Sequence, residues 1–206
     1  MILADDSSTD GTQAWAKERG IPCIALAGGN VSANRQVAVE FLRDSLRWDA
    51  PIAFFDNDVV VSPDWWERLQ RVFVEEPQVG VFAPRKVYAS GETQNVGNRL
   101  FLNGGSAPCK LEGRRVVVDY VETACMVVRP EVWRSVRWDA RFPLFYEDVD
   151  YCFQARSKGF EVMATAEVTV VHHAHTTSKA RSSESERNRM RFLEDRKSTR
   201  LNSSHT

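Results

Sequence analysis

The first 76 residues repeat one pattern three times: a short apolar stretch, a polar loop and a segment with helical periodicity. A chain that alternates strands and helices in this way packs its strands side by side, with helices over the faces. The predicted strands are 1–4, 20–26 and 52–55, and the predicted helices are 12–19, 31–47 and a third with Ser62 as N-cap and Pro63 at its first position. This pattern predicts an α/β domain built on a mixed, mostly parallel sheet flanked by helices.

The sequence after residue 78 has a different pattern, which predicts short strands separated by glycine-rich and polar loops. The predicted strands here are 79–83, 85–88, 116–120, 124–128 and 168–171, and the predicted helices are 131–136 and 149–158. We expect mixed or antiparallel pairing in this half. The sequence contains no internal repeat, no low-complexity linker and no second domain boundary.

The composition is that of one soluble α/β domain with a sizeable core: 206 residues, 43% of them hydrophobic, with 27 basic and 28 acidic side chains. The near balance of charge gives no electrostatic case for nucleic acid. The apolar runs fall short of the roughly 18 to 20 residues that cross a bilayer. The four cysteines form no C-x-x-C pair, which favours buried thiols in a reducing compartment. We therefore expect a cytoplasmic protein, with the inner face of the membrane as the alternative location.

Both ends of the chain depart from the pattern of a whole α/β domain. The chain opens on the second half of a strand, so we expect the preceding strand and helix to be missing. Residues 195–205 resemble one reading frame of a widely used sequencing adapter. We expect 1–194 to form a domain truncated at its N-terminus and 195–206 to be a non-native tail, with an ordinary polar tail as the alternative.

Two aspartates, Asp56 and Asp58, directly follow the apolar stretch 52–55. A short apolar run bounded by polar residues predicts a parallel strand covered on both faces, and α/β sheets bind ligands just beyond the carboxyl ends of such strands. Carboxylate oxygens at that edge suit a divalent metal and the diphosphate whose charge it neutralises. A turn that only caps the next helix is the alternative.

Three further stretches carry polar groups that suit the same kind of site. They are 5–12 (Asp-Asp-Ser-Ser-Thr-Asp-Gly-Thr), 145–150 (Phe-Tyr-Glu-Asp-Val-Asp) and 170–173 (Val-Val-His-His). Taken alone, Glu147 and Asp148 are typical of an acidic first helical turn, and His172 is typical of a histidine at a strand end. Their occurrence together with Asp56 and Asp58 favours one site for a metal and a nucleotide.

The four stretches together resemble family 2 glycosyltransferases of the GT-A fold, of the rhamnosyltransferase-like kind, over residues 2–178. The stretch 5–12 resembles the D-D-G-S-x-D-G-T nucleotide loop, with Ser7 where glycine is usual. Residues 33–35 resemble the helix start of the N-x-x-R-N type, and 123–126 resemble the small-residue strand before the acceptor helix. The resemblance implies that the chain is a GT-A domain of a transferase.

This resemblance implies a nucleotide-sugar donor, linked to UDP or dTDP, and a Mn²⁺ or Mg²⁺ ion. The implied metal ligands are Asp56, Asp58 and His172, and the implied nucleotide-binding residues are Asp5, Asp6, Ser8, Asn34, Arg35 and Asp56. Either Asp5 or Asp6 would accept the imide proton of the base, and an exposed first helical turn is the alternative for 34–35. Asp148 is the implied general base, supported by Glu147, and a direct displacement by the acceptor would invert the sugar.

The implied acceptor is a glycan or a lipid-linked sugar of a bacterial envelope polysaccharide or rhamnose-containing polymer. The basic run 179–191 favours either contact with an anionic membrane or a solvated helix face. Two other functions stay open: a non-catalytic nucleotide-binding or scaffold fragment, and a metal-dependent phosphoesterase. The phosphoesterase would use the aspartates with His172, His173 and His175, and the absence of a second Asp/His cluster argues against it.

Overall fold

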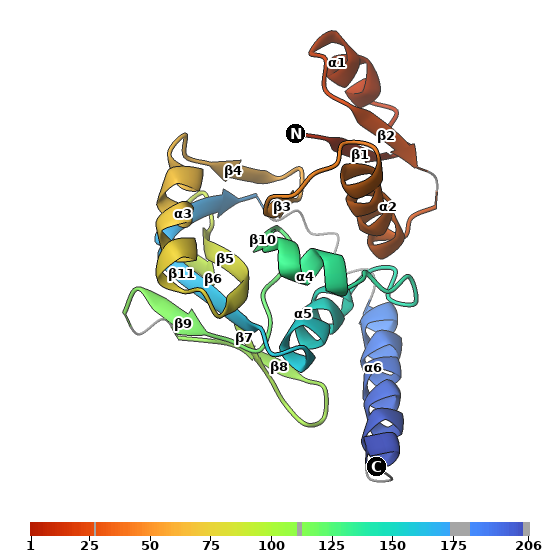
Figure 1. The fold of residues 1–206 in the computed structure, drawn as a ribbon, viewed down its shortest axis with the longest axis vertical. Helices are drawn as coiled ribbons and strands as arrows, with labels where there is room; N and C mark the ends of the chain where they lie inside the picture. The colour runs from red at the N-terminus through yellow and green to blue at the C-terminus, as the bar shows by residue number, and fades with distance from the viewer. Residues whose placement is uncertain (27, 111–112, 174–181, 204–206) are drawn as a thin grey trace.

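The computed structural model describes residues 1–26, 28–110, 113–173 and 182–203. Its helices are α1 (Thr12–Glu18), α2 (Val31–Asp44), α3 (Trp65–Glu75), α4 (Pro130–Ser135), α5 (Glu147–Ser157) and α6 (Ser182–Ser203). Its strands are β1 (Leu3–Asp6), β2 (Cys23–Leu26), β3 (Ile52–Phe55), β4 (Val59–Val61), β5 (Val79–Val87), β6 (Thr93–Asn95), β7 (Asn98–Leu100), β8 (Ser106–Pro108), β9 (Arg115–Val117), β10 (Cys125–Val128) and β11 (Glu161–His172). In Figure 1 the N-terminal strands and α1 lie to one side of the main body, and α6 extends away from it.

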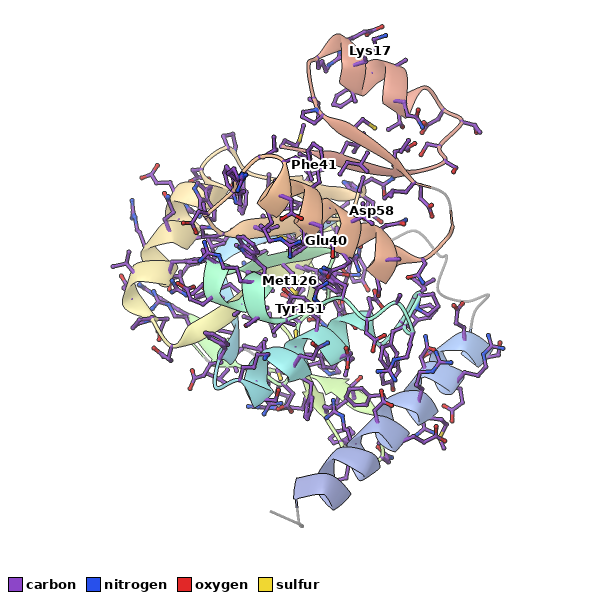
Figure 2. All side chains as sticks on the ribbon, turned by 45° about the vertical axis from the view of Figure 1, so that its right-hand side comes forward. Lys17, Glu40, Phe41, Asp58, Met126 and Tyr151 are labelled. Carbon is purple, nitrogen blue, oxygen red and sulfur yellow. The ribbon has the colours of Figure 1, made fainter. Side chains whose placement is uncertain are left out.

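The N-terminal unit is a two-stranded parallel sheet with α1 and α2 as its helices. β1 pairs with β2 from Leu3 opposite Cys23 to Asp6 opposite Leu26. Lys17 of α1 lies at the outer end of this unit in Figure 2, away from Met126 and Tyr151 in the core of the main body. The strand, loop and helix order predicted for this part of the chain is confirmed.

The main sheet has the strand order β3-β10-β5-β11-β4, with β6 paired to β5 and β9 paired to β11. β5 and β11 run parallel over most of their length, whereas β3, β4, β6 and β9 each pair in the antiparallel sense. The predicted mixed α/β class is confirmed. The prediction that 52–55 is a parallel strand is wrong, because β3 pairs with β10 in the antiparallel register Phe55 to Cys125.

The central strands are buried on both faces, which explains why their sequences are almost continuously apolar. Alternate residues serve two different cores because side chains of a strand point to opposite faces. Val81 and Ala83 of β5 pack in the larger core with α4 and α5, and Phe82 packs in the smaller core. Leu69 of α3 belongs to that smaller core. The α3 helix and the α4–α5 pair therefore cover opposite faces of the sheet.

Several helix boundaries differ from the prediction, among them the start of α3 and the end of α2. α3 begins at Trp65 with Asp64 as N-cap, so Ser62 is not the N-cap and Pro63 is not the first helical residue. The physical reason is that the ladder between β4 and β11 keeps the chain extended as far as residue 61. Ser62 instead donates a hydrogen bond to Asp64 Oδ1 at 2.6 Å. α2 ends at Asp44, before Arg47, whose φ of 53° is left-handed.

The last strand is longer than predicted. β11 covers Glu161–His172, not only 168–171, with register shifts that include one between Thr165 and Thr169. Polar residues at that irregularity interrupt the apolar pattern, so sequence periodicity shows only the second half. The added half matters because it forms the long parallel ladder with β5 that holds the C-terminal end of β11 in place.

The C-terminal helix α6 packs on the α5 side of the main body. Phe192 is buried in the larger core, and Arg196 lies over the ring of Phe153. Arg141 forms an ion pair with Asp195 at 2.9 Å. Within the described residues, no helix has the length and apolar character needed to cross a membrane.

Candidate active site

Asp58 and His172 meet at the edge of the main sheet. The β4–β11 ladder places Val59 opposite His172, and the backbone N–H of His173 donates to the carbonyl oxygen of Asp58 at 2.8 Å. As a result, Nε2 of His172 lies 3.3 Å from Oδ1 of Asp58, with side chains only 13% and 19% exposed. The other ring nitrogen of His172, Nδ1, lies 2.8 Å from Oε1 of Gln94.

This Asp58–His172 pair fits a divalent cation. Oδ1 of Asp58 is buried and accepts no hydrogen bond from the residues that the structure describes, which is costly unless a cation or proton occupies the gap. Neighbouring ligands of an octahedral Mn²⁺ or Mg²⁺ ion, each about 2.1 Å from the metal, lie roughly 3 Å apart, close to the distance observed here. Among the described residues no group of three or more His, Cys, Asp or Glu side chains forms a metal site, and Asp58 and His172 are the pair of ligands that these residues bring together.

Asp56, predicted as a further ligand, is engaged elsewhere. Its Oδ1 accepts a hydrogen bond from Nη2 of Arg35 at 3.1 Å, and its side chain is 41% exposed. Arg35 also donates from Nη1 to Oε1 of Glu147 at 3.3 Å, and its guanidinium lies over the ring of Trp138. One side chain of α2 thus connects the Asp56–Asp58 loop to the start of α5.

The loop before α5 has a strained backbone and leads directly into two carboxylates. Phe145 and Tyr146 both have left-handed backbones, with φ of 64° and 69°, which bulky side chains rarely adopt. The amide of Asn188 in α6 donates to the carbonyl oxygens of residues 144 and 145, and the hydroxyl of Tyr146 donates to the carbonyl of Gly104. These contacts hold the loop so that Glu147 and Asp148 form the first turn of α5.

Both carboxyl groups have raised pKa values. Burial raises the pKa of Glu147, which is 7% exposed, although the neighbouring Arg35 acts in the opposite direction. Burial also raises the pKa of Asp148 well above that of an ordinary aspartate, and the charges of Glu147 and Glu122 add to the effect. The backbone N–H of Val149 donates to Oδ1 of Asp148 at 2.8 Å. A carboxylate in such a setting has the proton affinity expected of a general base.

A polar network on β5 and β6 borders this acidic group, and the motifs of the sequence did not reveal it. Lys86 is 2% exposed and forms an ion pair with Glu122. Nδ2 of Asn95 donates to the other carboxylate oxygen of Glu122 at 3.2 Å. The available signal was a lysine inside the apolar run of β5, because a buried cation needs an anionic partner. Gln94 was missed as well, and an isolated glutamine gives no comparable signal.

At the end of β1, the two adjacent aspartates Asp5 and Asp6 occupy different environments. Asp5 is buried, and its Oδ2 accepts hydrogen bonds from Gln13 Nε2 at 2.7 Å and from the backbone N–H of Ser8 at 3.3 Å. Hydrogen bonds from Ser8 and Gln13 lower the pKa of Asp5. Asp6 is exposed. Ser7 adopts a left-handed φ of 64°, the conformation that a glycine at this position adopts without strain, and its hydroxyl donates to the carbonyl of Leu26.

The first turn of α2 is packed against the loop before α5. The side chain of Asn30 caps the helix by accepting from the backbone N–H of Ala33 at 3.0 Å. Ser32 is fully buried and donates to the carbonyl of Phe142 at 2.6 Å. Asn34 is partly buried one turn further along. The structure therefore brings 34–35 near the acidic turn, whereas His175 and residues 179–181 of the basic run lie outside the described residues.

Two surface cavities formed by described residues lie away from these groups. One, of about 330 Å³, is lined by Arg68, Arg71 and Arg114 beside β11. The other, of about 460 Å³, lies between Phe153 of α5 and Phe160. Neither is lined by the aspartates, glutamates or histidine described above.

A mixed α/β sheet with carboxylates and an Asp–His pair at its strand ends defines the GT-A class of domains, whose ligands bind at that edge. Residues 3–192 match the family described as "Glycosyltransferase like family 2", and the chain belongs to this family.

Two relatives match most of the chain at low identity. The O-antigen biosynthesis protein RfbC of Myxococcus xanthus is 25% identical over 144 residues, which are 63% of this chain and 11% of the relative. The low-salt glycan biosynthesis hexosyltransferase Agl10 of Haloferax volcanii is 20% identical over 182 residues, which are 84% of this chain and 58% of the relative. The chain thus spans less than two thirds of either relative's length.

Two solved structures share the fold. A crystal structure of GalNAc-T7 with UDP, GalNAc and Mn²⁺ superposes with a TM-score of 0.60 at 10% identity, over 80% of this chain and 34% of that one. The crystal structure of A197 from STIV superposes with a TM-score of 0.52 at 16% identity, over 84% of each chain. At these identities the likeness concerns the fold alone.

Proposed function

We propose that this chain is the donor-binding and catalytic domain of an inverting glycosyltransferase. In this proposal it moves a sugar from a UDP- or dTDP-sugar to a hydroxyl group of a glycan or lipid-linked acceptor. The observation that carries the proposal is the Asp58–His172 pair, in which a buried carboxylate oxygen lies 3.3 Å from an imidazole nitrogen and accepts no hydrogen bond within the described part of the chain. Membership of the glycosyltransferase family and the raised pKa of Asp148 support it.

Asp58 and His172 would hold a Mn²⁺ or Mg²⁺ ion, and the nitrogen ligand favours Mn²⁺. When bound, such an ion neutralises charge on the diphosphate of the donor as the sugar departs. GalNAc-T7, which shares the fold, was crystallised with UDP and Mn²⁺. Asp56 would contact the ribose or complete the metal site from its position against Arg35.

Asp148 would act as the general base. The acceptor hydroxyl gives its proton to the Asp148 carboxylate while its oxygen forms the bond to the anomeric carbon and the bond from that carbon to the diphosphate oxygen breaks. A single displacement of this kind inverts the configuration of the sugar. Glu147 would position the turn through Arg35, since its Oε1 is occupied by that guanidinium.

The nucleotide would bind on the loop after β1 and the start of α2. Asp6 is the exposed carboxylate of its pair and is assigned the contact with the base imide, whereas Asp5 anchors the loop through Gln13 and Ser8. Ser8, which follows β1, and Asn34, in the first turn of α2, would complete this set.

The acceptor class rests on the relatives. One is named for O-antigen biosynthesis and the other for glycan biosynthesis, which supports a polysaccharide or lipid-linked glycan as acceptor. Synthesis of such polymers from nucleotide sugars favours a cytoplasmic site at the inner face of the membrane. We assign the basic residues of α6 no role in membrane contact.

Calorimetric titration of UDP and dTDP, with and without Mn²⁺, tests the donor site. Asp58→Ala should abolish the metal-dependent part of binding, whereas the exposed Asp44→Asn should leave it unchanged. A panel of UDP- and dTDP-sugars then tests turnover through release of the nucleotide. Absence of nucleotide binding by a cooperatively folded chain would contradict the proposal, as would phosphate release from simple phosphoesters, which indicates a phosphoesterase.

A further inference from the structure

The ring of His172 is held by a residue from another strand. Gln94 belongs to β6, which pairs with β5 through Lys86 opposite Asn95. β5 in turn pairs with β11, where Val87 lies opposite Val171. Gln94 reaches over this ladder, and its Oε1 lies 2.8 Å from Nδ1 of His172.

The choice of hydrogen-bond partner determines the tautomer of His172. A neutral imidazole carries one N–H, and a carbonyl oxygen can only accept a hydrogen bond. With Oε1 of Gln94 as the acceptor, Nδ1 of a neutral His172 ring is the donor and Nε2 keeps its lone pair. Free histidine has the opposite preference, so the protein must impose this tautomer.

The environment of Nε2 agrees with this tautomer. Oδ1 of Asp58 lies 3.3 Å from Nε2, yet this oxygen accepts no hydrogen bond from any described residue. If Nε2 carried the proton, the buried carboxylate would be its natural acceptor. Two lone pairs that face each other at this distance, both shielded from water, form a site for a cation.

We propose that Gln94 is a positioning residue that holds His172 in the Nδ1–H tautomer, so that Nε2 is free to bind a divalent cation together with Asp58. The inference rests on the proposed function, because it assigns the cation to the same site. Hydrogen bonds to the second nitrogen of a metal-binding histidine commonly fix its orientation and tautomer, and their loss lowers metal affinity about 10- to 100-fold.

The side chains of β6 divide between the two halves of the candidate site. Gln94 points to His172, whereas the next residue, Asn95, donates to Glu122 and to Oδ1 of Asn98. Gln94 is the residue of β6 passed over at a register shift, where Lys86 of β5 lies opposite Asn95 and Val87 lies opposite Thr93. The irregular pairing of β6 with β5 thus places Gln94 beside His172.

The tautomer can be measured without any metal. Long-range ¹H–¹⁵N spectra of protein labelled with ¹⁵N-histidine distinguish the two ring nitrogens, and His172→Gln assigns the signals. At a pH where the ring is neutral, the metal-free wild type should show the Nδ1–H form. Gln94→Glu, which keeps the acceptor, should retain it, and Gln94→Leu should move the ring toward the Nε2–H form.

Mn²⁺ titration in the presence of UDP provides the second measurement. Gln94→Leu should bind Mn²⁺ about 10- to 100-fold more weakly. Gln94→Glu should bind it at least as well as the wild type, and the exposed Gln70→Leu serves as the matched control. An Nε2–H tautomer in the wild type overturns the inference, and this result needs no variant to fold.

Different results would contradict the role of Gln94 and the proposed function. Unchanged tautomer and Mn²⁺ affinity in folded Gln94→Leu overturn the role of Gln94 while nucleotide binding and turnover persist. A folded wild type that binds no Mn²⁺ with UDP overturns the proposed function and, with it, the ligand role of His172.

Discussion

Arg35 of α2 donates a hydrogen bond to Glu147 of α5, 112 residues further along the chain, at 3.3 Å. The same guanidinium reaches Asp56, so one cation compensates two carboxylates from two other segments. Glu147 is the more buried of these carboxylates, and no described residue donates a hydrogen bond to its Oε2. The ion pairs of Arg35 therefore hold Asp56 and Glu147 in their positions in the candidate site.

Replacement of Arg35 by leucine should destabilise the protein by roughly 3 kcal/mol, because loss of one partner leaves the buried Glu147 charge without compensation. Thermal and urea unfolding measure this change. The double variant Arg35→Leu, Glu147→Gln should recover most of the loss, since the orphaned charge is then absent. Arg43→Leu, which breaks an exposed pair with Asp44, should cost less than about 1 kcal/mol. Equal losses in the two single variants would contradict this account.

Asp148→Asn should lower turnover by roughly 10²- to 10⁴-fold, the usual contribution of a general base. Binding of UDP and Mn²⁺ should change little, because the candidate metal pair is formed by Asp58 and His172. Nucleotide release from a UDP- or dTDP-sugar measures the first quantity and calorimetry the second. Parallel losses in binding and turnover would instead assign Asp148 to the donor site.

The raised pKa of Asp148 predicts the pH dependence of turnover. A base works only when deprotonated, so kcat/KM should fall on acidification at a pH above the range of an ordinary aspartate. Because the charge of Glu122 contributes to the raised pKa, Glu122→Gln should move this acid limb to lower pH. An acid limb that stays in place in folded Glu122→Gln would show that the titrating group is not Asp148.

Asp150 should make stability depend on pH. Burial raises its pKa to about 6, whereas in the unfolded chain it is about 3.9. Between these values the folded state retains a proton that the unfolded state has released, so the free energy of unfolding falls as the pH rises. Asp150→Asn should remove this slope and raise the free energy of unfolding at pH 7 by roughly 1 to 2 kcal/mol, since partial solvent contact reduces the full effect. Urea unfolding at pH 5 and pH 7 measures it, with Asp44→Asn as control.

Ser7 offers a test of backbone strain in the nucleotide loop. Both Ser7→Gly and Ser7→Ala lose the hydrogen bond to the carbonyl of Leu26, but only glycine relieves the left-handed φ of 64°. Ser7→Gly should therefore be more stable than Ser7→Ala by about 1 kcal/mol. Equal stability of the two variants in urea would show that the loop relaxes to another conformation.

Local sequence pattern predicted the parts of the fold that local forces determine. The three strand–loop–helix units appear in order, and Asp58 and His172 lie together as the motifs implied. The pairing of β3 with β10 was not predictable, because an apolar run has the same pattern in parallel and antiparallel neighbours when both faces are buried.

The support of the candidate site was hidden for a related reason. Gln94, Glu122 and Asn188 act through contacts with residues far away in the sequence, and none of them belongs to a recognisable motif. The start of α3 was misplaced because β4 pairs with a strand more than 100 residues later, and that pairing overrides the local signal of Ser62 and Pro63. In both cases the structure depends on contacts between residues far apart in the sequence, and local sequence pattern does not reveal such contacts.

The contact of Asn188 with the loop before α5 leads to the last prediction. Its amide donates to the carbonyl oxygens of Leu144 and Phe145 at 2.8 and 3.0 Å, and it is 3% exposed. These bonds hold the left-handed Phe145 and Tyr146, whose strain would otherwise relax and move Asp148. Because a displacement of about 1 Å can cost 10²-fold in rate, Asn188→Leu should lower turnover by roughly 10- to 100-fold.

Binding of UDP and Mn²⁺ to Asn188→Leu should stay close to that of the wild type, because Asp58 and His172 lie on other elements. Nucleotide release and calorimetry on the same preparation separate the two effects. Arg187→Leu, an exposed change one residue earlier in α6, controls for a general effect on the helix. Wild-type turnover in folded Asn188→Leu would mean that the loop keeps its strained backbone without the hydrogen bonds from Asn188, through its other contacts such as the hydrogen bond from Tyr146 to Gly104.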